Sequence, residues 1–337
     1  MRRHREWGEL TVKKIFIVAP GNAVSGGPEV LHQLGDCLNR HVRRAWMLYR
    51  PFGQPHEVPA AYSRYNVIPA CLDDVEPGSV VILPEICASL VDRFPTAQVY
   101  IWWLSVDFFF DQAAHTPPLG ILGARAMVKR QLTTMRQRVA CHMYQSEYAH
   151  QFLESASLGP TVHLADYLAE EYVGAAMQSR QKPREDLVVF NPAKGRKRTK
   201  AVLRALDKSG GPKPQVVPIQ GMTRDEVCDL LGRAKLYMDF GGHPGKDRIP
   251  REAAALGACV LLNRRGSAAN PVDVPISPNF KIDDREPGFE QLAVEKIHML
   301  IEDYEHQAPQ FDDYRHSIAT EPAAFLEDVR SVFGEDL

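Results

Sequence analysis

The stretch 236–263 constrains the fold more than any other part of the chain. Its apolar run 236–240 predicts a buried strand, which leads into a loop with three glycines at 241–245. Pro250 predicts the first position of a helix, because the N–H that proline lacks has no partner there. The apolar run 259–262 predicts a second strand directly after that helix. This order of elements is the repeating unit of parallel α/β sheets.

The same stretch carries the residue types of an anion site. Gly245, Lys246 and Arg248 precede the predicted helix, whose first turn is expected to hold Glu252. A helix N-terminus presents unpaired backbone N–H groups and the positive end of the helix dipole. We therefore expect this segment to hold the phosphates of a nucleotide-linked donor. His243 could orient the donor or transfer a proton, and a hydrogen-bonded structural histidine is the alternative interpretation.

The rest of the chain repeats the strand-then-helix unit in two halves. This alternation predicts two Rossmann-like α/β domains with parallel sheets and a cleft between them. The polar segment 166–184 predicts the junction, so the first domain is 1–168 and the second is 169–319. A last helix, within 320–337, is expected to return and pack on the first domain. Further strands are expected at 15–20, 45–49, 79–83, 98–104, 142–145, 161–164, 187–190 and 215–219.

Two places in the first domain predict ligand contacts. Gly26 and Gly27 would let a ligand approach the backbone, although a tight turn explains them equally well. Their loop lacks the G-x-G-x-x-G spacing of dinucleotide-binding domains. Asp107 follows the most aromatic strand, 98–104, and precedes an expected aromatic loop at 108–110. Open α/β sheets bind ligands at the carboxyl ends of strands, so Asp107 is a catalytic candidate, unless it only caps a turn.

Two basic segments allow two interpretations each. Five of the seven residues 194–200 are basic, and Lys194 and Arg196 lie nearest the preceding strand. They are candidates for a diphosphate, although such a run is usually just solvated. The predicted helix 120–139 combines an apolar face with five basic residues. Such a helix can make a peripheral contact with anionic lipid, but a solvated face over a core stripe is the commoner arrangement.

Composition disfavours several classes of protein. The net charge of −2 over 337 residues implies no general attraction to nucleic acid. The six cysteines include no C-x-x-C pair, which disfavours a disulfide framework or a zinc site. No apolar run approaches the roughly 18 residues of a membrane span, and no signal-peptide pattern is visible. We therefore expect a cytoplasmic protein.

Two motifs in the second half carry a resemblance to a known family. Residues 188–196 read VVFNPAKGR, and residues 251–262 read REAAALGACVLL. Their order resembles the GT-B glycosyltransferases of the group-1 type, which use nucleotide-diphosphate sugars. Pro244 departs from that pattern, because the family usually has a further glutamate eight positions before the one that Glu252 matches. The resemblance is specific over about 187–262 and general elsewhere.

The resemblance implies transfer of a sugar from a nucleotide-diphosphate donor to a saccharide or a lipid-linked glycan, as in bacterial-type polysaccharide biosynthesis. It implies no cofactor besides the nucleotide sugar, which is a co-substrate. It assigns Glu252 to the donor ribose. We expect the acceptor on the first domain, between the Gly26-Gly27 loop and residues 103–110. Asp107 would be the base of an inverting reaction, or would orient the acceptor in a retaining one. The full set of expected site residues is Lys194, Arg196, Gly245, Lys246, Arg248 and Glu252 for the donor, Gly26 and Gly27 for the acceptor or diphosphate, and Asp107 and His243 for catalysis.

Metal independence is a further expectation. No Asp-x-Asp pair is placed to hold a metal between strands. Lysine, arginine and a helix dipole can instead neutralise the leaving diphosphate. Two alternatives share the architecture: a nucleotide-sugar 2-epimerase and a non-catalytic nucleotide- or sugar-binding module.

Overall fold

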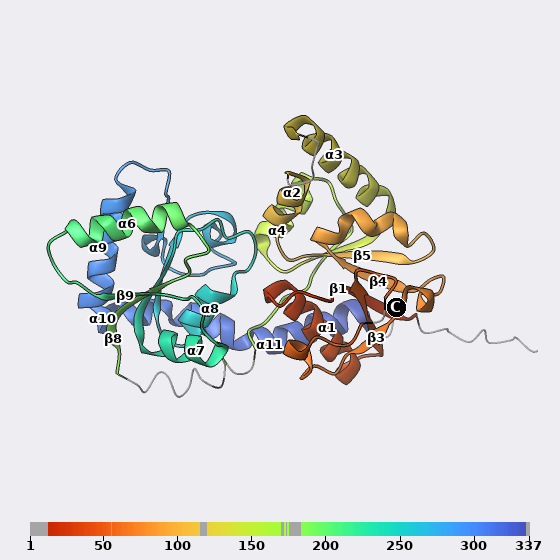
Figure 1. The fold of residues 1–337 in the computed structure, drawn as a ribbon, viewed down its shortest axis with the longest axis horizontal. Helices are drawn as coiled ribbons and strands as arrows, with labels where there is room; N and C mark the ends of the chain where they lie inside the picture. The colour runs from red at the N-terminus through yellow and green to blue at the C-terminus, as the bar shows by residue number, and fades with distance from the viewer. Residues whose placement is uncertain are drawn as a thin grey trace, which may run out of the picture.

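The protein consists of two lobes, each a parallel β-sheet covered by helices (Figure 1). The computed structural model describes residues 13–54, 56–114, 120–169, 172, 174 and 183–334. Most of the predicted junction, 166–184, lies outside these residues. The two parallel sheets confirm the α/β architecture expected from the alternation of strands and helices.

The N-terminal sheet has seven parallel strands in the order β3-β2-β1-β4-β5-β6-β7. Its central strands are continuous apolar runs because helices cover both faces. The strands are β1 (Ile15–Pro20), β2 (Ala45–Arg50), β3 (Ile68–Ala70), β4 (Val80–Pro84), β5 (Gln98–Trp103), β6 (Val139–Tyr144) and β7 (Thr161–His163). The α-helices are α1 (Gly26–His41), α2 (Val106–Ala114), α3 (Gly120–Arg138) and α4 (Glu147–Ser155), and the 3-10 helices are η1 (Ala60–Tyr62), η2 (Leu72–Asp74) and η3 (Glu85–Arg93).

The C-terminal sheet has five parallel strands in the order β12-β11-β10-β8-β9. The stretch 236–263 supplies its centre: β10, α8 and β11 follow one another there. The strands are β8 (Glu185–Phe190), β9 (Gln215–Pro218), β10 (Ala234–Asp239), β11 (Cys259–Asn263) and β12 (Lys281–Ile282). The α-helices are α6 (Arg196–Lys208), α7 (Arg224–Arg233), α8 (Arg248–Ala255), α9 (Phe289–Glu302) and α10 (Tyr304–Gln307), and the 3-10 helices are η4 (Gly266–Ala269), η5 (Pro278–Phe280) and η6 (Ala308–Phe311).

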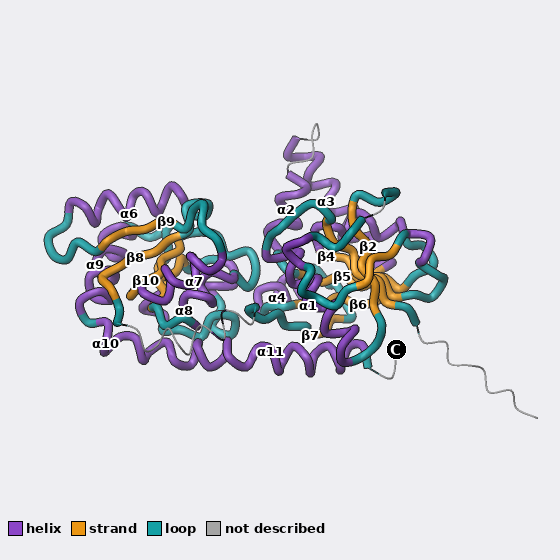
Figure 2. Tube along the Cα trace, turned by 60° about the horizontal axis from the view of Figure 1, so that its bottom comes forward, coloured by secondary structure: helices purple, strands orange, loops and turns teal. Residues whose placement is uncertain are grey.

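One long helix, α11 (Asp312–Phe333), runs beneath both lobes (Figures 1 and 2). Tyr314 and Ile318 pack in the core of the C-terminal lobe. Phe325, Val329 and Phe333, further along the helix, pack in a core of the N-terminal lobe. Helix α11 therefore belongs to the hydrophobic cores of both lobes and connects them.

Two local expectations were wrong. The aromatic residues 108–110 are not a loop, because α2 begins at Val106 and includes them. Helix α8 begins at Arg248, two residues before Pro250, so Glu252 lies in its second turn. Asp107 is accordingly a first-turn residue of a helix, where an acidic side chain is stabilised by the helix dipole.

The five basic residues of helix α3 fall into two groups, those that bond to the backbone and those that are exposed. Arg136 and Arg138 donate hydrogen bonds to backbone carbonyls of Ala156 and Pro95, at 2.6 and 3.2 Å. The other three basic residues of the helix are exposed: Arg125, Lys129 and Arg130. Across the described part of the chain, no helix is long and apolar enough to cross a membrane.

The lobes meet across buried charged side chains. Arg251 of α8 is 1% exposed and donates to Asp166, which follows β7, at 2.5 Å. It also donates to Glu321, in the middle of α11, at 2.8 Å, and Lys246 pairs with Glu321 at 2.9 Å. Burial alone would raise the pKa of Asp166, but the charges of Arg251 and Lys246 outweigh it and hold that pKa below its usual value. These contacts fix α8 against the N-terminal lobe.

We expect Arg251→Met to lower the free energy of unfolding by about 3–5 kcal/mol, because it leaves the two buried carboxylates of Asp166 and Glu321 with Lys246 as their remaining partner. Chemical denaturation measures this change. Arg204→Met, at an exposed arginine of α6, is the matched control and should stay within about 0.5 kcal/mol of wild type. An Arg251→Met protein as stable as that control would contradict a stabilising role for this contact.

Candidate functional site

The loop 241–245 lies between the two lobes and separates two cavities. Pro244 O accepts a hydrogen bond from Val106 N at 3.0 Å, which joins the loop to the start of α2. Pro244 and Gly245 line the larger cavity, of ≈ 790 Å³, and Gly242 lines the smaller one, of ≈ 640 Å³. Both volumes suit small-molecule ligands.

The larger cavity brings together most of the donor residues predicted from the sequence. Gly26 and Gly27, at the start of α1, form part of its wall on the N-terminal lobe. The first N–H groups of a helix have no partner within the helix. The C-terminal lobe contributes Lys194, Gly245, Lys246, Arg248 and Glu252. Arg196 is exposed at the first position of α6 and does not line this cavity.

Most charges in the larger cavity already have partners of opposite sign. Glu29 of α1 is 2% exposed and accepts from Arg248, Arg224 and Arg64. Burial would raise the pKa of Glu29, but the charges of Arg248 and Arg224 outweigh it and lower that pKa. Arg248 also lies 3.5 Å from Glu252, whose pKa burial raises despite that charge. The cations expected to meet phosphate are therefore engaged with carboxylates of both lobes.

His243 and Lys194 both contact Asp247, a partly buried residue that lines the larger cavity. Asp247 Oδ1 accepts from Lys194 Nζ at 2.6 Å, and Asp247 Oδ2 lies 2.8 Å from His243 Nδ1. His243 is 1% exposed and lines neither cavity. Burial would lower the pKa of His243, but its hydrogen bond to Asp247 and the charge of Asp239 outweigh it and raise that pKa. This placement matches the structural alternative for His243 and gives it no direct path to a substrate.

One group within the described residues has ligand atoms close enough for a metal ion. Asp239, His243 and Asp247 each offer an atom within 4.8 Å of the others. Their oxygens already accept bonds: Asp239 from Gly241 N and from the Tyr237 hydroxyl, and Asp247 from Lys194. A cation at this position would compete with the positive charge of Lys194. Metal independence stays a prediction.

Glu85, at the start of η3, is a cavity residue that the sequence analysis missed. It lines the larger cavity but is only 3% exposed, and its Oε2 accepts from Leu104 N at 2.9 Å. Burial raises the pKa of Glu85 to about 8, although backbone N–H groups oppose the shift. Only its position directly after a buried strand could have marked it.

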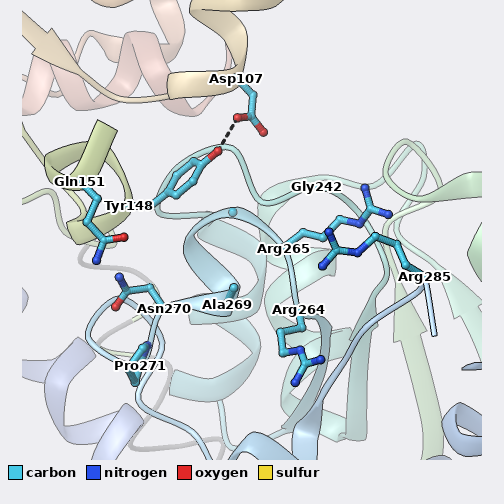
Figure 3. A pocket seen from close by; sticks show the side chains of 11 residues that line it. Asp107, Tyr148, Gln151, Gly242, Arg264, Arg265, Ala269, Asn270, Pro271 and Arg285 are labelled. Atoms are coloured by element: carbon cyan, nitrogen blue, oxygen red, sulfur yellow. Dashed lines mark hydrogen bonds between the residues drawn. The ribbon is translucent and has the colours of Figure 1, made fainter. Parts of the chain in front are cut away.

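The smaller cavity contains Asp107 and not the glycines expected beside it. The hydroxyl of Tyr148 donates to Asp107 Oδ1 at 2.8 Å. Figure 3 shows this pair and Gln151 on one side of the cavity and three arginines on the other. The arginines are Arg264, Arg265 and Arg285. Gly26 and Gly27 lie in the other cavity, so the expected single acceptor surface is divided by the loop 241–245.

The fold is shared with several solved structures. Sucrose-phosphate synthase from Thermosynechococcus elongatus matches 95% of this chain and 100% of its own, at 10% identity and a TM-score of 0.61. The N-terminal domain of Candida albicans trehalose-6-phosphate phosphatase matches 96% and 97%, at 11% identity and 0.61. The catalytic domain of starch synthase IV from Arabidopsis thaliana, bound to ADP and acarbose, matches 95% and 99%, at 11% and 0.55.

These similarities establish the fold and nothing finer at such identities. No protein-family model and no curated protein matches the sequence. The two-domain GT-B architecture expected from the resemblance is confirmed.

We expect Glu85→Gln to flatten the pH dependence of stability. The folded state keeps the Glu85 proton up to about pH 8, whereas an unfolded glutamate loses it near pH 4.3. Protonation of Glu85 therefore contributes fully to the free energy of unfolding below about pH 4.3. This contribution is lost as the pH rises toward 8, by up to about 1.4 kcal/mol per pH unit. Glutamine does not titrate, so the variant lacks this loss.

Denaturation at several pH values between about 5 and 8 measures this slope. The exposed Glu295 gives the matched control, Glu295→Gln, which should keep the wild-type slope. An unchanged slope in Glu85→Gln would mean that Glu85 is ionised in the folded protein.

Proposed function

We propose that this protein transfers a sugar from a nucleotide-diphosphate donor to a saccharide or lipid-linked glycan. The observation that carries the proposal is the ≈ 790 Å³ cavity between two Rossmann-like lobes, where the start of α1 faces Lys194 and Glu252. Ligands of open α/β sheets bind at the carboxyl ends of the strands, which is where these residues lie.

The donor diphosphate would lie between α1 and Lys194. The backbone N–H groups of Gly26 and Gly27 can bind phosphate oxygens without a side chain in the way. The side chain of Lys194 is 31% exposed, against 16% for Lys246 and 19% for Arg248. Lys194 is thus the most accessible of these three cations predicted from the sequence.

The buried carboxylate of Glu252 would accept hydrogen bonds from the donor ribose. It lines the same cavity and is 4% exposed. Arg248, its neighbour on α8, balances part of its charge from 3.5 Å. A ribose hydroxyl at this position would supply the donor that a buried carboxylate requires.

The transferred sugar would lie at the loop 241–245, where the two cavities approach one another. Negative charge grows on the diphosphate as the glycosidic bond breaks, so fixed positive groups stabilise the transition state more than the ground state. A Cβ atom built on Gly242 would lie 4.0 Å from Asp107 Oδ2, so the Asp107 carboxylate lies close to this loop, on its acceptor side. In an inverting reaction it would take the proton of the acceptor hydroxyl, with Tyr148 fixing its orientation.

We expect one of UDP, ADP, GDP, dTDP or CMP to raise the stability of the wild type in a thermal-shift panel. At about 100 times its dissociation constant, a ligand adds roughly 2.7 kcal/mol. Lys194→Ala should lose most of this gain because the diphosphate loses its cation. Lys200→Ala, at an exposed lysine of α6, is the matched control. If no nucleotide stabilises the wild type, the donor-site assignment is wrong.

We expect Asp107→Asn to bind the same nucleotide with unchanged affinity but to transfer sugar roughly 10²–10⁴-fold more slowly. The measurement is product formation from the matching nucleotide sugar with a panel of saccharide acceptors. Asp92→Asn, at an exposed residue of η3, controls for the loss of a charge on the same lobe. Full activity in Asp107→Asn would remove this residue from the mechanism, and an epimerised donor formed without acceptor would favour the 2-epimerase.

A further inference from the structure

The smaller cavity has a strong excess of positive charge. Its lining includes Arg264, Arg265 and Arg285 but only one carboxylate, Asp107. In the larger cavity the cationic and acidic side chains are nearly balanced. The cations there are Lys194, Arg224, Lys246 and Arg248, and the acids are Glu29, Glu85, Asp166, Asp247 and Glu252. The two cavities therefore suit ligands of different charge.

The arginines of the smaller cavity are held in place from behind. Arg285 donates to Asp283 from Nε at 2.8 Å and from Nη2 at 2.6 Å. Arg265 donates to Asp284 from Nε at 2.6 Å, and Arg264 donates to Glu286 at 2.6 Å. Asp283 and Asp284 are 6% and 8% exposed and do not line the cavity. The bonds of Arg265 and Arg285 to these two buried carboxylates favour one orientation of each guanidinium, which lowers the entropy cost of binding.

These contacts leave donors unused. Within the described residues, neither Nη atom of Arg265 has a partner, and the same holds for Nη1 of Arg285. Asp284 shares its charge with Arg198, whose Nε lies 3.0 Å away. Arg264, Arg265, Arg285 and Arg198 have three acidic partners, Asp283, Asp284 and Glu286, which leaves one positive charge without a direct ion pair on this side of the cavity.

We propose that the smaller cavity binds a saccharide that carries an anionic group, a phosphate or a carboxylate, on Arg265 and Arg285. Planar guanidinium groups match both oxyanions and bind them with paired hydrogen bonds. Gln151 and Asn270 also line the cavity and offer amide groups to sugar hydroxyls. Asp107 lies on the opposite side (Figure 3). The identification of this saccharide as the acceptor rests on the proposed glycosyl transfer.

The position of the arginines gives the anion a defined function. Arg264 and Arg265 follow β11, and Arg285 follows β12, so they belong to the C-terminal lobe, whereas Asp107 belongs to the N-terminal lobe. An acceptor whose anionic group binds the arginines of the C-terminal lobe would present its hydroxyl groups toward Asp107 on the N-terminal lobe. The charged group then selects the acceptor, and the carboxylate acts on a hydroxyl of the same molecule.

The test is isothermal titration of the full chain with glucose 6-phosphate, glucuronate, inorganic phosphate and neutral glucose. We expect at least one of the anionic probes to bind more tightly than glucose. Arg265→Gln should weaken that binding roughly tenfold or more, because a charged hydrogen-bonding pair is lost. Arg204→Gln, at an exposed arginine outside both cavities, should bind like wild type. A preference for glucose 6-phosphate identifies a phosphate, and a preference for glucuronate identifies a carboxylate.

Arg265→Lys keeps the positive charge but loses the planar pair of donors. It should bind the anion with intermediate affinity, and it serves as the second variant if Arg265→Gln does not fold. The proposal is overturned if no anionic probe binds in the millimolar range, or if glucose binds as tightly. It is also overturned if both variants bind the anion like wild type.

A competition titration separates this proposal from the donor assignment. The nucleoside diphosphate that stabilises the wild type should bind together with the anionic sugar, because the two occupy different cavities. Displacement of one by the other would place the anion in the larger cavity and overturn the proposal. If the anionic sugar binds in the Arg265-dependent way but no nucleotide binds, the anion site stands and the glycosyltransferase proposal fails.

Discussion

Buried ion pairs between the lobes determine the geometry of everything else in this structure. Removing a guanidinium from water costs several kcal/mol, and only well-placed acceptors offset that cost. Arg251 finds them on two other parts of the chain, at Asp166 and Glu321, so α8 is fixed relative to β7 and α11 at once. At Glu29 the charges are reversed: one buried carboxylate of the N-terminal lobe pairs with arginines from both lobes. A hydrophobic interface could slide, whereas these pairs define one relative position of the lobes.

If the proposed donor binds, the same pairs link its binding to the relative position of the lobes. Arg248 faces the larger cavity, but it bonds to Glu29 of the opposite lobe. A diphosphate that drew Arg248 away would leave Glu29 with less positive charge and would weaken the contact between lobes. A ligand shifts a conformational equilibrium by its difference in affinity for the two states. In this protein that difference includes the exchange of an internal carboxylate for an external phosphate.

The elements could be predicted from the sequence, but their partners could not. Apolar runs such as those of β1 and β11 reveal buried parallel strands because both faces are covered. The start of α8 was placed two residues late because Pro250 was taken as its first residue, whereas proline also fits the third position, whose N–H has no partner within the helix. Glu29 and Glu85 look like ordinary helix-start acids, and only the tertiary fold buries them. Asp107 and Gly26 were assigned to one surface because a linear sequence does not show which side of a loop each residue faces.

The glycines of the loop 241–245 were expected to belong to an anion site, but the structure also shows a packing reason for them. A Cβ on Gly245 would overlap the carbonyl oxygen of Leu104 at the end of β5. A Cβ on Gly266, which has φ +53°, would overlap the carbonyl oxygen of His243 to the same extent. The missing side chains let the loop 241–245 pack backbone to backbone against both lobes. That close packing is what divides the space between the lobes into a cavity with balanced charge and a cavity with excess positive charge. The glycines of this loop therefore have a packing role in the structure, whether or not Gly245 also contacts a donor.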